Sequence, residues 1–186
     1  MAEPVETLIG TVTAEHFRPG HVRHQVVAGP KFLYALFNPR DQMHHVSRAF
    51  MTFVRDGDLP YRRLIVNDHI VDEATTRLKK QASMRNAASF LTTLDESTLY
   101  QFEAVSEDIF RDGKGMFVEW TDLDASFTDF VVAAHMGVLE VDHILTYDRH
   151  YDCSIENTRR RRGRGLKTAR ELVFCHSDRI ILSAAC

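Results

Sequence analysis

The sequence predicts an α/β fold, in which helices cover both faces of a mostly parallel sheet, and three observations lead to it. Short apolar stretches typical of strands alternate with longer segments whose apolar residues recur at helical spacing. The 186 residues, 44% hydrophobic and 26% charged, are typical of one domain with a buried core. No apolar run approaches the roughly 20 residues of a membrane span. Alternating strands and helices favour parallel strand pairs.

The predicted elements begin at residue 25, after a lead-in that several prolines and glycines interrupt. Residues 1–24 are expected to be poorly ordered, with one short strand at Leu8–Val12. Asn38-Pro39 should end the first helix, and Gly137 should act as the C-cap of the last one. The remaining elements are expected to be, in chain order, strand Gln25–Ala28, helix Phe32–Phe37, helix Asp41–Arg55, strand Arg63–Asn67, helix Asp68–Ser83, strand Leu99–Val105, a helix through Ile109 and Phe117, helix Ser126–Gly137 and strand Asp142–Tyr147.

Charge divides the chain into an acidic body and a basic tail. Residues 1–150 hold 15 Lys and Arg against 22 Asp and Glu, whereas residues 151–186 hold 8 against 4. An acidic body disfavours broad nonspecific binding of nucleic acid but suits carboxylates gathered around a metal. The chain is therefore expected to comprise a lead-in (1–24), a folded domain (25–152) and a basic tail (153–186). The run Arg159–Arg162 is either a phosphate-binding segment or a solvated one.

The cysteines and the N-terminus indicate a reducing compartment. Cys153, Cys175 and Cys186 form no CxxC pair, so free thiols are expected here, not a disulfide framework or a zinc site. The first residues, Met-Ala-Glu-Pro, lack the basic and apolar regions of a secretion signal. A cytoplasmic protein without a membrane segment is the expectation. The ten histidines show no compact ligand spacing, and His44-His45 is expected on a solvated helix face.

Glu73 is one of three acids whose positions indicate chemistry. At roughly 100° per residue, it falls on the flank of the apolar helix face that Ile70, Ala74 and Leu78 form. Its neighbour Asp72 points nearly opposite, toward solvent. An acid at the rim of a core face can reach into a cleft. The alternative is an ordinary surface acid on a helix.

Asp129 and Asp148 are the other two candidates. Asp129 lies on a helix that is apolar on both sides, where a carboxylate must be paired, hydrogen-bonded or bound to a cation. Ser126-Phe-Thr-Asp129 also fits a capping box, which is the structural alternative. Asp148 follows the last predicted strand, at the edge where parallel sheets bind ligands, although Asp-Arg-His is also typical of a turn.

Three carboxylates converging on one cleft favour a hard cation, Mg²⁺ or Mn²⁺. Such an ion polarises a phosphoryl oxygen and generates hydroxide, so the pattern indicates phosphodiester hydrolysis. Motifs of other chemistries are missing from the sequence: it has no GxSxG elbow and no HExxH, and Gly113-Lys114-Gly115 lacks the remaining residues of a P-loop. Glu73, Asp129 and Asp148 are therefore the predicted catalytic and metal-binding residues.

The ordered set of motifs over roughly residues 25–152 resembles PIN-domain ribonucleases, in particular VapC-like toxins of type II toxin–antitoxin systems. The resemblance rests on the segment from Phe32 to Asp41, the step from Val66-Asn67 to Glu73, and the C-terminal motifs. Those motifs are Asp122-Leu-Asp124, Ser126-Phe-Thr-Asp129 and Leu145-Thr-Tyr-Asp148-Arg-His-Tyr151. It implies a three-layer α/β/α sandwich, Mg²⁺-dependent cleavage of RNA, a homodimer and inhibition by a small antitoxin protein. Glu73, Asp129 and Asp148 match metal-site acids of the family, and Asp122 is a weaker match.

One position departs from the family pattern. The family places an acidic residue at the end of its first strand, where this chain has Gly29, within Ala28-Gly29-Pro30-Lys31. Mg²⁺ tolerates extra water ligands. One consequence of the missing carboxylate is therefore a metal site that persists but binds Mg²⁺ more weakly. The second hypothesis is a PIN-like domain that binds RNA or an antitoxin without cleaving. The third hypothesis is a phosphate-ester hydrolase of another kind. It is disfavoured because Gly29 has no side chain that could act as the nucleophile of a phosphoenzyme mechanism.

Overall fold

The computed structural model describes residues 4–7, 10–13, 24–141 and 143–147. Four short strands form its central sheet: β3 (Gln25–Ala28), β4 (Arg63–Val66), β5 (Tyr100–Phe102) and β6 (Ile144–Leu145). Their order is β5-β4-β3-β6, and every neighbouring pair is parallel. The central strands β3 and β4 are almost entirely buried and apolar, as parallel strands covered on both faces must be. The predicted parallel sheet is confirmed.

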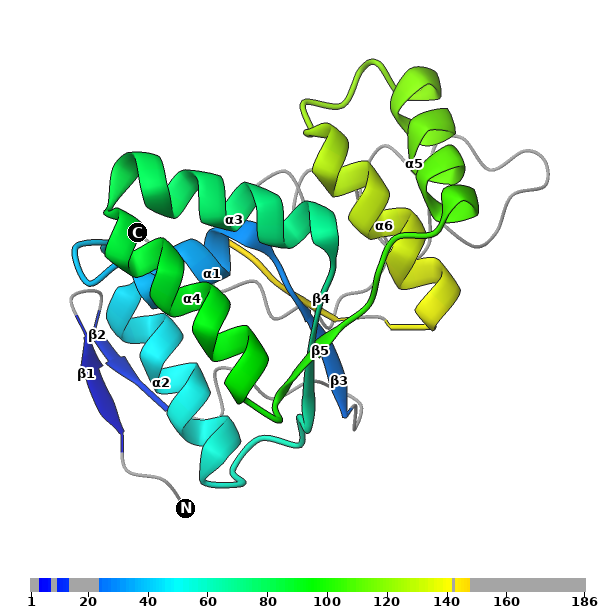
Figure 1. Cartoon of the computed structure of the whole chain (residues 1–186). Helices are drawn as coiled ribbons and strands as arrows, with labels where there is room; N and C mark the ends of the chain where they lie inside the picture. The colour runs from blue at the N-terminus through cyan, green and yellow to red at the C-terminus, as the bar shows by residue number, and fades with distance from the viewer. Residues whose placement is uncertain (1–3, 8–9, 14–23, 142, 148–186) are drawn as a thin grey trace.

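Six helices surround this sheet: α1 (Pro30–Phe37), α2 (His44–Arg55), α3 (Asp68–Gln81), α4 (Met84–Glu96), α5 (Glu107–Glu119) and α6 (Phe127–Leu139). Figure 1 shows the sheet between α1–α4 on one side and the α5–α6 pair on the other. Within the first group α1 packs on α2 and α3, and α3 packs on α4. The predicted α/β sandwich is therefore confirmed.

The core fills both sides of the sheet with large side chains. Phe32, Phe50 and Tyr61 are fully buried on the side of α1 and α2, where the Phe32 and Phe50 rings meet edge to face with centroids 5.6 Å apart. Such pairs add to the stabilisation that area burial provides. On the other side Phe130 is buried in α6, next to Trp120 at the end of α5. No helix in the described part of the chain combines the length and apolarity that crossing a membrane requires.

Two strands precede the domain where the sequence predicted a single one. β1 (Val5–Thr7) and β2 (Gly10–Val12) form an antiparallel hairpin, which lies beside α2. Val12 is buried in the core. The predicted strand at Leu8–Val12 thus overlaps β2, but part of the lead-in packs on the domain. The other lead-in residues, and all of the predicted tail, lie outside the described residues.

The structure corrects the prediction between residues 68 and 99. A single helix ending at Ser83 was expected, but α3 ends at Gln81 and a second helix, α4, follows after a sharp turn. Ser83 is the N-cap of α4, because its hydroxyl accepts a hydrogen bond from the Asn86 amide at 3.1 Å. The serine that the prediction placed at a helix end therefore starts a new helix.

The predicted C-cap at Gly137 is wrong. α6 continues past this glycine to Leu139, and the left-handed residue that ends it is Glu140, with φ of 53°. The Glu140 and Val141 amides return to carbonyls of the last turn. The exposed Glu140 thus takes the left-handed conformation that glycine usually adopts at a helix end. The sequence pattern did not indicate this. The other predicted helix and strand ends lie within three residues of those in the structure.

Candidate metal centre

The candidate site lies where β3 and β4 end and the helices α1 and α3 begin. Gly29 follows β3 and is the N-cap of α1, and Asn67 follows β4 and is the N-cap of α3. The Asn67 side chain accepts a hydrogen bond from the Ile70 amide at 2.9 Å, which fixes the start of α3. The carboxyl ends of parallel strands are the usual ligand-binding edge of α/β folds. Residues in the first turns of α1 and α3 therefore face this edge.

Glu73 is half-buried on α3, as its position beside the apolar face predicted. Ile70, Ala74 and Leu78 are buried, and Asp72 is exposed. Burial raises the pKa of the Glu73 carboxyl, because the charged form loses water. A hydrogen bond from the Thr128 hydroxyl opposes this shift by stabilising the carboxylate.

Asp129 lies close enough to Glu73 for the two charges to repel. This repulsion raises the pKa of Glu73 further, whereas the cations Arg77 and Lys31 lower it. The structure therefore brings two of the three predicted acids together, from α3 and from the first turn of α6. Two adjacent carboxylates in a partly dry environment favour the binding of a cation between them.

Asp129 also forms the predicted capping box. Its Oδ2 accepts hydrogen bonds from the Ser126 amide and hydroxyl, both at 2.8 Å, and the Ser126 hydroxyl accepts one from the Asp129 amide at 3.2 Å. The structural interpretation of Ser126-Phe-Thr-Asp129 is thus correct. It is compatible with the functional interpretation, because the cap holds the same carboxylate beside Glu73.

The third predicted acid, Asp148, lies outside the described residues, so the set of three is not tested. Across the described ranges, no group of three or more His, Cys, Asp and Glu side chains is arranged to hold a metal. The weaker candidate, Asp122, is exposed between α5 and α6. Within the described part of the chain, the candidate site is the pair Glu73 and Asp129.

Three neighbours of the pair were not predicted. Thr128 donates to Glu73, and Lys31 and Arg77 are close enough to lower the pKa of its carboxyl. Thr128 stands directly before Asp129, inside a motif that carried the resemblance, and Lys31 belongs to the step Ala28-Gly29-Pro30-Lys31 that departs from the family pattern. Arg77 is one helical turn after Glu73 and follows from the (i, i+4) spacing.

A second polar cluster lies beside this site at the ends of β4 and β5. The buried His135 of α6 accepts a hydrogen bond at Nδ1 from the Asn67 side chain, at 3.1 Å. Burial lowers the pKa of His135, and the nearby carboxylates of Glu103 and Asp68 oppose the shift. The Asp68 carboxylate accepts a hydrogen bond from the Val105 amide at 2.8 Å. The cluster joins α6 to the ends of two strands.

Gly29 is in close contact with the neighbouring strand β6. Its amide donates a hydrogen bond to the Leu145 carbonyl oxygen at 2.9 Å, and an added Cβ would lie only 2.8 Å from that same oxygen. The backbone angles at Gly29, φ −67° and ψ 160°, are open to any residue. Glycine is required here by space, so an acid at this position would have to displace β6.

A solved structure supports the fold that the resemblance implied. The toxin VapC20 of Mycobacterium tuberculosis, whose structure is described as that of a sarcin-ricin loop cleaving toxin, superposes with a TM-score of 0.59. The match covers 67% of this chain and 90% of VapC20. The chain has a VapC-type PIN fold. Sequence identity is 20%, so the likeness concerns the fold. Scans against protein-family models and against curated proteins find no match.

The residues at this edge of the PIN fold suit a hard divalent cation. Glu73 and Asp129 offer carboxylate oxygens, which are the ligands that Mg²⁺ and Mn²⁺ prefer. Burial is the main cause of the raised pKa of Glu73, and the charge of Asp129 adds to it. Mg²⁺ usually binds through one or two carboxylates and keeps several waters. Two acids therefore meet the minimum that such an ion needs.

Proposed function

We propose that this protein is a Mg²⁺-dependent endoribonuclease of the VapC toxin kind, with Mn²⁺ as an alternative ion. The observation that carries the proposal is the Glu73 and Asp129 pair at the ligand-binding edge of a PIN fold. Glu73, Asp129 and Asp148 are the proposed ligands. The ion would supply a polarised phosphoryl oxygen and an activated water for phosphodiester hydrolysis.

The protein's own side chains prepare this site. The Thr128 hydroxyl holds the Glu73 carboxylate in place, and the Ser126 cap holds Asp129. Lys31 and Arg77 partly oppose the rise in the pKa of Glu73 that burial causes, and so favour the charged form that a metal needs. These two cations also offset the repulsion that an approaching RNA phosphate would meet at the acidic edge.

The proposed function includes the partners that such toxins require. The substrate is RNA, and a small antitoxin protein is expected to cover the active edge. The protein is proposed to act as a homodimer in the cytoplasm. None of these partners is part of the structure, and each follows from the likeness to VapC toxins together with the candidate site.

Metal binding and RNA cleavage test the proposal together. Glu73→Gln should abolish Mg²⁺-dependent cleavage and the heat of Mg²⁺ binding in calorimetry, because one of the two paired carboxylates is gone. Asp72→Asn, the adjacent exposed acid on the same helix, is the matched control and should retain both. Equal Mg²⁺ affinity in the Glu73→Gln variant would exclude this edge as the metal site.

The second candidate function is RNA or antitoxin binding without cleavage, and Gly29 favours it. A missing first-strand carboxylate would weaken the proposed metal site, and any side chain at this position would crowd the Leu145 carbonyl oxygen. A Gly29→Asp variant should bind Mg²⁺ more tightly and cleave RNA faster if a folded form accommodates the acid. RNA binding by the natural chain without cleavage at saturating Mg²⁺ would support the second candidate.

A further inference from the structure

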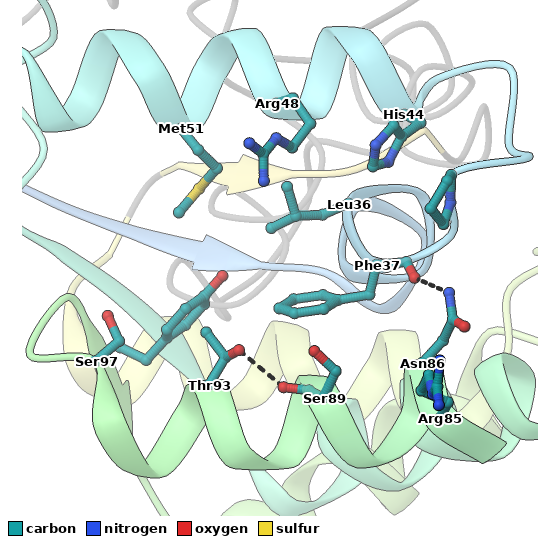
Figure 2. A pocket seen from close by; sticks show the side chains of 12 residues that line it. Leu36, Phe37, His44, Arg48, Met51, Arg85, Asn86, Ser89, Thr93 and Ser97 are labelled. Atoms are coloured by element: carbon teal, nitrogen blue, oxygen red, sulfur yellow. Dashed lines mark hydrogen bonds between the residues drawn. The ribbon is translucent and has the colours of Figure 1, made fainter. Parts of the chain in front are cut away.

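A separate pocket lies between α2 and α4, and its floor is formed by the end of α1. Its volume is about 560 Å³, within the range of pockets that hold small-molecule ligands. Figure 2 shows Leu36 of α1 facing Arg48 and Met51 of α2, and Phe37 lying over α4 near Ser89 and Thr93. None of its lining residues belongs to the Glu73 and Asp129 site.

The pocket is positively charged although the body of the protein is acidic. Arg48 comes from α2 and Arg85 from α4, and the lining includes no Asp or Glu. Neither arginine forms an ion pair with a carboxylate of the described ranges. A neighbouring pocket of about 540 Å³ shares Arg48 and adds Arg62, whereas its Arg55 is paired with Asp56 at 3.0 Å. Arginines without a carboxylate partner attract an anion.

A buried hydroxyl in the lining lacks a partner. Tyr100 of β5 lines the pocket, and its hydroxyl is inaccessible to solvent and makes no hydrogen bond. Burial raises the pKa of this group, so it stays protonated and can donate. An unsatisfied buried hydroxyl costs free energy, and a ligand acceptor would remove that cost where binding moves aside the side chains that cover the hydroxyl.

Hydrogen bonds hold the pocket open in a defined shape. The Asn86 side chain of α4 donates to the Phe37 carbonyl at 2.5 Å and ties α4 to the end of α1 (Figure 2). His44 was expected on a solvated helix face, but it is half-buried and its Nδ1 donates to the Ala35 carbonyl at 2.9 Å. The ring is thereby fixed in the pocket wall beside Arg48. Preformed groups of this kind reduce the entropy that binding costs.

We propose that this pocket binds a small phosphate-bearing ligand with an aromatic or apolar body, of which a mononucleotide is representative. The phosphate would lie at Arg48, with Arg85 adding positive charge from the opposite wall. Leu36, Phe37 and Met51 offer the apolar surface for the body. The Tyr100 hydroxyl gains its missing acceptor.

Calorimetry in a metal-free buffer with chelator tests the proposal, with adenosine monophosphate, inorganic phosphate and adenosine as probes. The monophosphate should bind the full-length protein, phosphate more weakly, and adenosine least. Arg48→Gln should weaken binding about tenfold or more, as loss of a hydrogen-bonded charge predicts. Arg111→Gln on α5 removes the same charge from an exposed position outside the pocket and should change nothing.

Tyr100→Phe supplies a second readout that a merely structural role would not give. This variant should bind the monophosphate a few-fold more weakly, yet its unliganded melting temperature should be at least that of the natural protein. Glu73→Gln should bind the monophosphate normally, which separates this pocket from the metal site. The proposal fails if adenosine binds as tightly as its monophosphate, if Arg111→Gln is as harmful as Arg48→Gln, or if millimolar monophosphate does not bind.

Discussion

Gly29 shows how a single missing side chain connects the fold with the proposed activity. The resemblance to PIN domains expects an acid there, and the contact with the Leu145 carbonyl leaves no room for one. The same carbonyl accepts the Gly29 amide, so β3 and β6 are held at a short distance by one hydrogen bond. A chain that keeps this contact lacks one carboxylate that the family pattern would supply to the proposed metal site.

Gly29→Ala should therefore destabilise the protein by about 1–3 kcal/mol, the usual cost of overpacking. Gly115→Ala is the matched control, because a Cβ at Gly115 meets nothing within 4 Å. Alanine should stabilise that helix position by roughly 0.5–1 kcal/mol. Urea unfolding of both variants measures the two changes. A Gly29→Ala variant as stable as the natural protein would show that β6 yields easily, and the acid could then be restored.

His135 predicts a pH dependence of stability. Its pKa in the folded state is lowered, so folding favours the neutral imidazole that accepts the Asn67 hydrogen bond. This contribution is complete above the unfolded pKa of about 6.5 and is lost as pH falls through the lowered folded value. The natural protein should thus lose stability on acidification from about pH 7.

His135→Gln should reduce this dependence, because the amide does not titrate. Its free energy of unfolding should be lower than that of the natural protein at about pH 7.5, and the difference should shrink toward about pH 5. Urea unfolding across this range measures the effect. His45→Gln, on the exposed side of α2, is the control and should keep the natural profile. A difference that stays constant with pH would mean that His135 is protonated equally in both states.

At the scale of the helix, the N-cap of α6 serves both folding and the site. Ser126→Ala should cost about 1 kcal/mol of stability, as loss of an N-cap usually does. It should also weaken Mg²⁺ binding, because the Ser126 hydroxyl holds the Asp129 carboxylate. Ser106 caps α5 in the same way, with its hydroxyl accepting from the Ile109 amide at 3.3 Å. Ser106→Ala should cost similar stability and leave Mg²⁺ affinity unchanged.

Denaturation and calorimetry on the two serine variants separate capping from metal binding. Equal losses of Mg²⁺ affinity would indicate a general loosening of the domain. No loss in either would contradict the role of Asp129 as a ligand. Ser126 adjoins the Glu73 and Asp129 pair, whereas Ser106 does not. Comparing the two variants therefore separates an effect on Mg²⁺ binding from a general effect of losing an N-cap.

The sequence predicted elements best where burial and periodicity agree. β3 and β4 are apolar and short, and α2 has an amphipathic pattern, so each was found within three residues of its bounds. α4 was missed because Ser83 reads equally as a helix end and as an N-cap, and only tertiary packing on α1 and α3 decides. Glu73 and Asp129 could be paired because helix phase and strand order both point them at one edge. The contact of Lys31 with Glu73 depends on packing across the fold, which spacing alone does not give, whereas Arg77 follows from its (i, i+4) spacing on α3.

At the scale of the whole molecule, opposite charges are separated between two regions. The acid pair belongs to α3 and α6, and the pocket rich in arginine belongs to α2, α4 and the strand β5. A metal ion would bind to the first region and a phosphate to the second. The net charge of −3 conceals this division, as it conceals the difference between body and tail.

The basic tail gives the last prediction. β6 completes the described sheet against β3, and Tyr147 just after it hydrogen-bonds to Ser47 at 2.6 Å, which ties the end of the sheet to α2. The run Arg159–Arg162 is costly to bury. Deleting residues 154–186 should therefore leave the melting temperature nearly unchanged.

The truncated chain should lose only a salt-sensitive and sequence-independent part of its RNA affinity, because arginines contribute through phosphate charge. Binding of RNA oligomers of two unrelated sequences, measured at low and at moderate salt, resolves this part from the rest. Equal RNA affinity of the full-length and truncated chains would mean that the run Arg159–Arg162 does not contact RNA. Failure of the truncated chain to fold would mean that Glu171–Val173 or Ile180–Leu182 is a packed element, and that the domain extends beyond residue 152.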